Sequence, residues 1–217
     1  EMTFPKLRYS MFCGEALELK LVEEWAECVP NATIVNTYGP TENTVICTFY
    51  KYVRNENVTR NGVLSIGKVM GESELLLVDN DNNIVENGQE GELCLAGGQL
   101  NQGYWNNEEK NRNVFFTKKI NGVLRRMYRT GDLCIANDDG NLMYLDRIDF
   151  QTKIQGFRVE LSGVEFRAKE FLKSINVVAI AVKNKIENNE IGLVIQGPEI
   201  DTTNLFEYLK SKLPPYM

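Results

Sequence analysis

Residues 36–42, Asn-Thr-Tyr-Gly-Pro-Thr-Glu, place three side chains of different chemistry within a few positions of one another. Tyr38 offers an aromatic face, Thr41 a hydroxyl donor and Glu42 a hard oxygen ligand. These groups suit a purine, a phosphate and Mg²⁺, respectively. The alternative is an ordinary turn in which Thr41 caps the next segment. Taken alone, the stretch does not decide between a nucleotide site and a simple turn.

The neighbouring segments indicate how this stretch is positioned. Residues 32–35 are an apolar run that predicts a short buried strand. Gly39 and Pro40 then predict a sharp exit, because glycine tolerates a positive φ and proline fixes its own φ. Upstream, residues 15–29 carry apolar side chains at helical spacing and predict an amphipathic helix. The stretch therefore follows a strand in an α/β arrangement.

Two later stretches carry further candidate groups. Asp132 follows a glycine at the start of a predicted strand, within residues 128–133. A carboxylate there can accept two hydrogen bonds from a cis-diol, as acidic residues do for ribose in dinucleotide sites. A turn aspartate is the alternative. Residues 146–161 alternate charged and apolar side chains, and the alternative for them is an exposed β-ribbon with ion pairs.

Composition excludes several classes of function. With 217 residues, 43% of them hydrophobic, the chain can fill one large domain or two small ones. A net charge of −6 argues against nucleic-acid binding as the main role. We expect no membrane span and no signal peptide. Five scattered cysteines suit a reducing cytoplasmic location. The absence of histidine excludes Ser-His-Asp and Cys-His units within this chain and makes a zinc site improbable.

The order of predicted elements gives three segments. Residues 1–55 predict β-α-β-loop-β, an α/β layer. Residues 60–147 predict short strands with Gly/Asn turns, a small β-barrel or rolled sheet, and one helix near residues 106–113. Residues 149–217 predict a compact α+β unit. In that unit, residues 162–165 match a capping box, with Ser and Glu three positions apart.

These stretches, in this order and spacing, resemble the adenylate-forming superfamily: amino-acid adenylation domains, acyl- and aryl-CoA synthetases, and luciferases. The resemblance covers nearly the whole chain and includes the segments 12–15, 36–42, 91–93, 103–105, 128–133, 147–161 and 214–217. Within the superfamily, the D-alanine–carrier protein ligases are most similar, on the segments 11–15, 36–42, 149–151, 156–158 and 160–161. Those enzymes are similar to the adenylation domains of nonribosomal peptide synthetases.

The resemblance implies a fold and a reaction. Residues 1–148 match the C-terminal part of a large adenylation domain, and residues 149–217 match a small mobile α+β domain. The carboxylate of a small amino acid such as D-alanine is expected to attack the α-phosphate of ATP, with Mg²⁺, giving aminoacyl-AMP and releasing pyrophosphate. The phosphopantetheine thiol of a carrier protein then attacks this adenylate. The alternatives are an adenylation domain for another amino acid, an acyl- or aryl-CoA synthetase, or a non-catalytic adenylate- or carrier-binding module.

The resemblance also implies residue roles. Thr41 contacts the α-phosphate and Glu42 holds Mg²⁺. Residues expected to bind the nucleotide are Gly14, Glu15, Ala16, Asn36, Thr37, Tyr38, Asp132 and Arg147. Within this set, Tyr38 stacks on adenine opposite residues 14–16, Asn36 meets the adenine edge, and Asp132 with Arg147 binds the ribose hydroxyls. Residues expected to line the amino-acid pocket are Cys13, Gly39 and Pro40. The matched hinge is Asp149, and Gly156 matches the pantetheine path.

Two parts of the family's machinery do not occur in this sequence. It has no Gly/Ser/Thr-rich phosphate loop ending in lysine. The chain also stops at Met217, before the position where the family carries its catalytic lysine. That lysine neutralises the charge that develops during adenylation. We therefore expect this chain to be a fragment that binds nucleotide weakly and does not turn over by itself.

Overall fold

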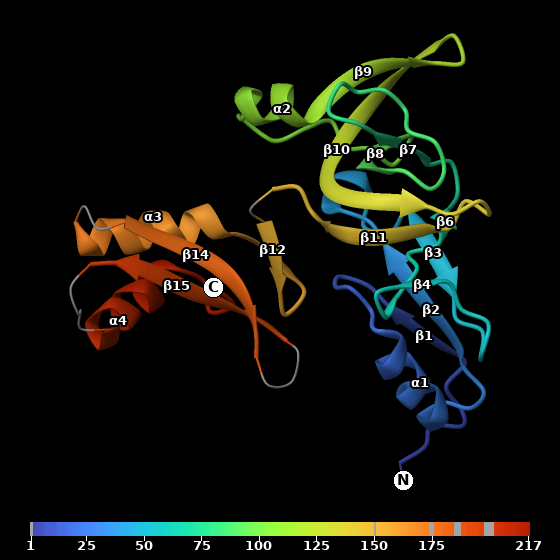
Figure 1. Ribbon diagram of the computed structural model, residues 1–217, viewed down its shortest axis with the longest axis horizontal. Helices are drawn as coiled ribbons and strands as arrows, with labels where there is room; N and C mark the ends of the chain where they lie inside the picture. Colours follow the sequence, from blue (N-terminus) through green and yellow to red (C-terminus); the bar gives the residue numbers. More distant parts are fainter. Residues whose placement is uncertain (1, 150, 174–175, 185–187, 198–201) are drawn as a thin grey trace. The chain divides into compact units, whose positions relative to one another are not determined.

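The computed structural model describes residues 2–149, 151–173, 176–184, 188–197 and 202–217 (Figure 1). The chain divides into two compact units, Glu1–Ile148 and Asp149–Met217, each with its own core. No helix in the described ranges has the length and hydrophobicity needed to cross a membrane.

The first unit begins with a four-stranded sheet in the order β1-β2-β3-β6. Its strands are β1 (Tyr9–Phe12), β2 (Thr33–Tyr38), β3 (Thr48–Lys51) and β6 (Lys68–Val69). The pair β1–β2 is parallel and β2–β3 antiparallel. The crossover between β1 and β2 is α1 (Leu19–Cys28). This is the predicted β-α-β-loop-β order.

Helix α1 is held to the sheet by one apolar stripe. Val22 and Ala26 are buried and pack with Val29, Ile34 and Leu64. Burial of a side chain such as Val22 stabilises the fold by roughly 1.5–3 kcal/mol. The helix thereby fixes the sheet that carries residues 36–42.

The chain leaves β2 through Gly39 and Pro40 and enters a 3₁₀ turn, η1 (Thr41–Asn43). The reason for glycine differs from the prediction. Gly39 is not among the positive-φ residues; Thr44 and Val45 are, at 54° and 72°. A Cβ on Gly39 would instead lie 2.4 Å from the carbonyl oxygen of Val45. Close backbone approach, rather than a left-handed φ, therefore requires glycine here.

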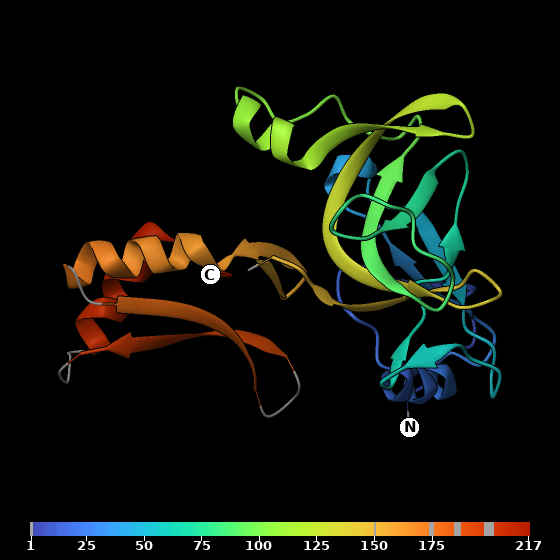
Figure 2. The ribbon, with the colours of Figure 1, turned by 45° about the horizontal axis from the view of Figure 1, so that its top comes forward.

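The second sheet has five strands and follows the order β11-β10-β8-β7, with β9 also paired to β10. Its strands are β7 (Glu74–Val78), β8 (Glu90–Ala96), β9 (Phe115–Ile120), β10 (Val123–Ala136) and β11 (Leu142–Arg147). Both ribbon views show β10 strongly curved, so the sheet rolls (Figures 1 and 2). The pairing forms an open path, closer to the rolled-sheet alternative than to a closed barrel.

Smaller elements complete the unit. A two-stranded ladder joins β4 (Thr59–Arg60) to β5 (Val63–Leu64), and α2 (Glu108–Val114) precedes β9. Side chains from both sheets build one core, made of Tyr38, Cys47, Ile66, Leu77, Leu93, Leu95, Cys134, Ala136 and Leu142. Because this core joins the end of β2 to β8 and β10, it brings residues 36–42 next to the second sheet.

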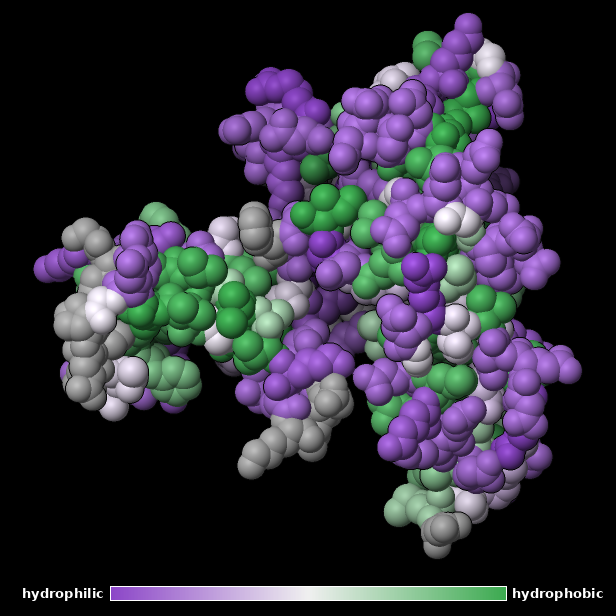
Figure 3. Space-filling view, in the orientation of Figure 1, coloured by the Kyte–Doolittle hydropathy of each residue, from purple (hydrophilic) through white to green (hydrophobic). Residues whose placement is uncertain are grey.

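The second unit is the α+β assembly that the sequence predicts. Its elements are β12 (Gln151–Ile154), β13 (Phe157–Glu160), α3 (Leu161–Leu172), β14 (Asn176–Lys183), β15 (Asn189–Gln196) and α4 (Thr202–Lys212). Side chains exposed on β14 and β15 include Val178, Ile180 and Val194, and the space-filling view shows hydrophobic surface over this unit (Figure 3).

The predicted capping box is wrong. Helix α3 begins at Leu161, one residue before Ser162, and its N-cap, Glu160, makes no side-chain capping bond. Glu165 instead accepts a hydrogen bond from the backbone N–H of Ala179, at 3.0 Å. The carboxylate is thus used between helix α3 and strand β14, because tertiary contact outweighs local capping here.

Candidate functional site

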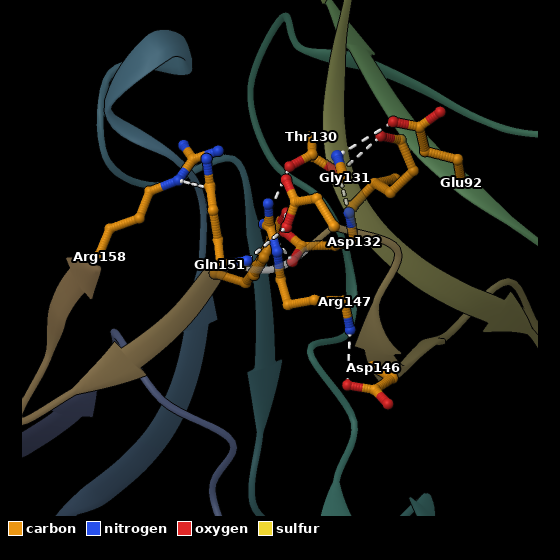
Figure 4. Close-up of polar contacts among 11 residues, drawn as sticks. Glu92, Thr130, Gly131, Asp132, Asp146, Arg147, Gln151 and Arg158 are labelled. Carbon is orange, nitrogen blue, oxygen red and sulfur yellow. Dashed lines mark hydrogen bonds and ion pairs between the residues drawn. The ribbon is translucent and has the colours of Figure 1, made fainter. Parts of the chain in front are cut away.

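Three predicted site residues from distant parts of the sequence meet in the first unit. Tyr38 lies at the end of β2, and its hydroxyl donates a hydrogen bond to Oδ2 of Asp132. Arg147, the last residue of β11, donates from a guanidinium nitrogen to Oδ1 of Asp132 at 2.7 Å. Asp132 is only 4% exposed. Figure 4 shows Asp132 and Arg147 facing each other, so the predicted ribose pair is brought together.

The β-sheet pairing explains this meeting. Asp132 and Arg147 are direct partners across the β10–β11 ladder. The β10–β8 register shifts between Arg129 and Leu133, and Gly131 has a φ of 72° inside this irregularity. The backbone N–H of Gly131 donates to Glu92 at 3.0 Å (Figure 4). A bulge of this kind re-aims side chains, and here it directs Asp132 toward Tyr38.

A second set of bonds fixes the backbone of Asp132. The hydroxyl of Thr130 donates to the carbonyl of Leu93 at 2.7 Å, and the N–H of Asp132 donates to that same hydroxyl at 3.0 Å. Arg147 also donates to the carbonyl of Thr130, at 2.9 Å. Asp132 is therefore held by hydrogen bonds at both its backbone and its side chain.

The protonation of Tyr38 follows from its surroundings. Burial raises the pKa of Tyr38 well above its usual range, and the charge of Asp132 raises it further. Its phenol therefore remains a neutral donor at physiological pH. Only 6% of Tyr38 is exposed, since its ring belongs to the core. Stacking on adenine would have to use that small exposed part of the ring, and it remains a prediction.

Glu42 lies in η1 and is only 5% exposed. Its Oε1 accepts a hydrogen bond from the hydroxyl of Tyr104, and its backbone carbonyl accepts one from the N–H of Asn101, at 2.8 Å. Burial raises the pKa of Tyr104 above its ordinary value, and the hydrogen bond to Glu42 raises it further. Tyr104 is thus a neutral donor to the carboxylate.

The surroundings of Glu42 fit a hard cation. The buried side-chain amide of Asn43, and Oδ1 of Asn101, have no hydrogen-bond partner among the described residues. Amide and carboxylate oxygens are ligand types of Mg²⁺, which also keeps several waters and phosphate oxygens. Among the residues that the structure describes, no group of three Asp, Glu, Cys or His lies close enough for an all-protein site. A cation at Glu42 would therefore need the oxygens of a bound nucleotide and water.

The other residues predicted to contact the nucleotide differ in their burial. Asn36 is buried, and its side-chain nitrogen donates to the carbonyls of Leu64 and Ser65 at 3.3 and 3.0 Å. The side-chain N–H groups of Asn36 are thus bonded to backbone carbonyls. The hydroxyl of Thr37 donates to the carbonyl of Phe12 at 2.8 Å, which ties β2 to the end of β1. Thr41, Glu15 and Ala16 are exposed.

The predicted pocket residues lie next to this region. Cys13 directly follows β1 and is exposed. Gly14, with a φ of 107°, turns the chain beyond it. Gly39 and Pro40 are half-buried at the exit from β2. Because Thr37 bonds to Phe12, the turns after β1 and β2 lie at the same edge of the sheet.

Asp149 and Gly156 belong to the second unit. Oδ1 of Asp149 accepts a hydrogen bond from the N–H of Gln151 at 3.1 Å. Gly156 turns between β12 and β13 with a φ of 80°, and a Cβ there would touch no protein atom within 4 Å. The side chain of Gln151 accepts a hydrogen bond from Arg158 and donates one to Glu160, both on β13. Figure 4 shows the bond to Arg158. Such bonds are those of a β-ribbon.

Comparison with known proteins finds relatives over most of this chain. Residues 1–105 match the AMP-binding enzyme family. The chain is 38% identical over 177 residues to the D-alanine–D-alanyl carrier protein ligase of Lacticaseibacillus casei, covering 81% of this chain and 34% of the ligase. It is 38% identical over 220 residues to tyrocidine synthase 2 of Brevibacillus parabrevis, covering 98% of this chain and 6% of that synthase.

A solved structure extends the likeness. The Vibrio cholerae adenylation domain AlmE, solved in complex with glycyl-adenosine-5′-phosphate, superposes with a TM-score of 0.86 at 28% identity, over 99% of this chain and 40% of AlmE. The chain is therefore similar to AMP-binding enzymes and to adenylation domains. The predicted fold class, an adenylation-domain segment with α/β and α+β parts, is thereby confirmed. The chain spans less than half the length of these three relatives.

One residue has a place in the site that the sequence did not predict. Tyr104 lies in the matched segment 103–105, yet no role was expected for it. The structure places its hydroxyl on Glu42, 62 positions earlier in the sequence. The available signal was the tyrosine of the Gly-Tyr-Trp motif, but a contact over such a separation has no local pattern.

Proposed function

We propose that this chain forms the nucleoside-binding part of an AMP-forming ligase that activates a small amino acid and transfers it to a carrier protein. The observation that supports this most strongly is the Tyr38–Asp132–Arg147 cluster. Its three side chains come from different strands and are joined at a buried carboxylate. The relatives of this chain include a carrier protein ligase and a tyrocidine synthase.

In this proposal, the chain's own residues orient the nucleotide. Asp132 and Arg147 bind the ribose hydroxyls, and the ion pair between them holds the Asp132 carboxylate in place. Tyr38 and residues 14–16 border the adenine, and Asn36 and Thr37 hold the strand end on which Tyr38 lies. ATP, when bound, supplies the α-phosphate that the amino-acid carboxylate attacks. Thr41 donates a hydrogen bond to that phosphate, and Glu42 binds the accompanying Mg²⁺.

The substrate and the partner follow from the same reasoning. Cys13, Gly39 and Pro40 offer a small apolar wall, which suits a short side chain such as the methyl group of D-alanine. Asp149 acts as the hinge between the two half-reactions, since a few backbone angles suffice for a domain rotation. Gly156 lets the pantetheine arm of a carrier protein pass close to the backbone, because it has no Cβ.

A second candidate is an adenylation domain of a nonribosomal peptide synthetase for another amino acid. It is favoured by the 38% identity to tyrocidine synthase 2, over 98% of this chain. Both candidates use the same nucleotide site and differ in the amino acid. We expect Cys13 and the residues at the exit from β2 to determine which amino acid is activated.

The test is amino-acid-dependent exchange of pyrophosphate into ATP, measured on this chain and on the complete polypeptide of its gene. A panel of D-alanine, L-alanine, other amino acids and short fatty acids separates the candidates. We expect D-alanine to give the highest exchange with the complete polypeptide. Exchange measured on this chain alone shows how much of the reaction its own residues support. Exchange that requires a fatty acid would contradict amino-acid activation.

A further inference from the structure

We propose that Tyr104 is a positioning residue that holds the carboxylate of Glu42 in the geometry in which it binds the nucleotide's divalent cation. The inference rests on the proposed function, because it deepens the role given there to Glu42. It starts from the hydrogen bond between the Tyr104 hydroxyl and Oε1 of Glu42. Tyr104 does not itself need to touch the cation or the substrate.

The segment that carries Tyr104 is bonded to the turn that carries Glu42 at several points. The N–H of Asn101 donates to the carbonyl of Glu42 at 2.8 Å. Gln99 accepts from the hydroxyl of Thr44 at 2.7 Å through its carbonyl, and its side chain donates to the carbonyl of Ile46 at 3.3 Å. These bonds hold the chain at Glu42 and in the four residues after it, and the phenol holds the side chain of Glu42.

Tyr104 is itself held in place. Its backbone N–H donates to Oδ1 of Asn111 at 2.7 Å, and Nδ2 of Asn111 donates back to its carbonyl at 2.9 Å. A Cβ on the preceding Gly103 would lie 2.8 Å from that same Oδ1, so the close approach of Asn111 depends on glycine. The ring also packs at 6.2 Å from that of Phe115. The hydroxyl therefore has little freedom to move away from Glu42.

A phenol suits this task better than a charged donor. Glu42 is only 5% exposed, and a buried carboxylate is costly unless it is hydrogen-bonded. An arginine or lysine would satisfy it, but would also neutralise the charge that attracts a cation. The phenol of Tyr104 donates a hydrogen bond to Glu42 and, as an ordinary tyrosine, carries no charge at physiological pH. Tyr104 thus orients Glu42 without bringing a positive charge to it.

The experiment compares ATP affinity without and with saturating Mg²⁺, by equilibrium titration of this chain. The ratio of the two dissociation constants measures the coupling between cation and nucleotide. Tyr104→Phe should reduce this ratio about tenfold, since one hydrogen bond to a charged group is lost. The metal-free affinity should stay unchanged. Tyr9→Phe is the matched control, because it also removes one phenolic hydroxyl, at a tyrosine that is 65% exposed.

A second variant separates positioning from general damage. In a Glu42→Gln background, Tyr104→Phe should produce no further change in the ratio, because its effect passes through the carboxylate. An unchanged ratio in Tyr104→Phe would overturn the inference, as would equal losses of metal-free and metal-bound affinity. If the wild-type chain binds ATP without any Mg²⁺ enhancement, the proposed role of Glu42 fails, and the inference with it.

Discussion

Asp132 accepts hydrogen bonds from Tyr38 and Arg147 in surroundings nearly closed to water. Such a buried pair does not by itself imply high stability, because desolvation offsets much of the attraction. Its value is geometric: the carboxylate can only point where its two donors direct it. Three residues distant in sequence thereby fix the orientation of the Asp132 carboxylate next to the end of β2.

Removing this carboxylate should destabilise the first unit. Asp132→Ala removes the carboxylate that faces the guanidinium of Arg147, whose side chain is 12% exposed. We expect the free energy of unfolding to fall by about 3 kcal/mol, measured by urea denaturation. Glu27→Ala is the control, because it breaks an ion pair with Arg54 in which both side chains are more than half exposed. That control should cost less than about 1 kcal/mol, and equal losses would contradict the account.

A buried thiol should make stability depend on alkaline pH. Burial raises the pKa of Cys47 from 9.0 to about 11. The unfolded chain releases this proton near pH 9, whereas the folded chain keeps it to about pH 11, so stability falls over that interval. Urea denaturation at pH 8 and pH 10.5 should show a smaller loss in Cys47→Ala than in the wild type. Equal losses in both proteins would contradict the shift.

At the scale of elements, the turn after β2 depends on one missing Cβ. Gly39→Ala would place a methyl group 2.4 Å from the carbonyl oxygen of Val45 and 2.9 Å from the nitrogen of Cys47. Relief requires backbone movement, so we expect a loss of about 2–3 kcal/mol and weaker nucleotide binding. Gly98→Ala is the matched control, since its added Cβ meets nothing within 4 Å. The measurement is thermal unfolding of both variants. Similar midpoints in the two would exclude the steric explanation.

The same elements show how far the sequence carries prediction. Apolar runs such as residues 75–78 and 92–96 predicted β7 and β8 closely, because buried central strands have a strong local pattern. Most of β9 and β10 was missed. Residues 123–129, Val-Leu-Arg-Arg-Met-Tyr-Arg, show no regular alternation of polar and apolar side chains, and their strand state depends on pairing with β8 and β9. The bulge at Gly131 and the Tyr104–Glu42 bond likewise arise from tertiary contacts, which no local spacing encodes.

At the scale of the whole molecule, the two units have separate cores, so their stabilities should respond separately. Gly163 lies exposed inside α3, with nothing within 4 Å of an added Cβ. Gly163→Ala should stabilise the second unit by about 0.5–1 kcal/mol, since alanine favours the helix. Hydrogen exchange of α3 and α4 should slow, while that of β8 and β10 stays unchanged. Slower exchange in both units would contradict independent stability.

The opposite sign is expected at Gly156 in the same unit. This residue also has open space around an added Cβ, but its φ is 80°. Gly156→Ala should therefore destabilise the unit by roughly 1 kcal/mol, through backbone strain alone. The comparison of two glycine substitutions in open space isolates φ as the cause. Stabilisation of the unit by Gly156→Ala, in the same exchange measurement, would contradict this reasoning.

The central claim is that the buried Tyr38–Asp132–Arg147 cluster is the ribose side of a nucleotide site. Equilibrium titration of this chain with AMP tests it most directly, comparing the wild type with Asp132→Asn, which keeps the shape but removes the charge. We predict weak, saturable binding by the wild type and an affinity lower by about tenfold in Asp132→Asn, since a hydrogen bond to a charged group is lost. Equal affinities in two folded proteins, or no binding by the wild type, would contradict the account.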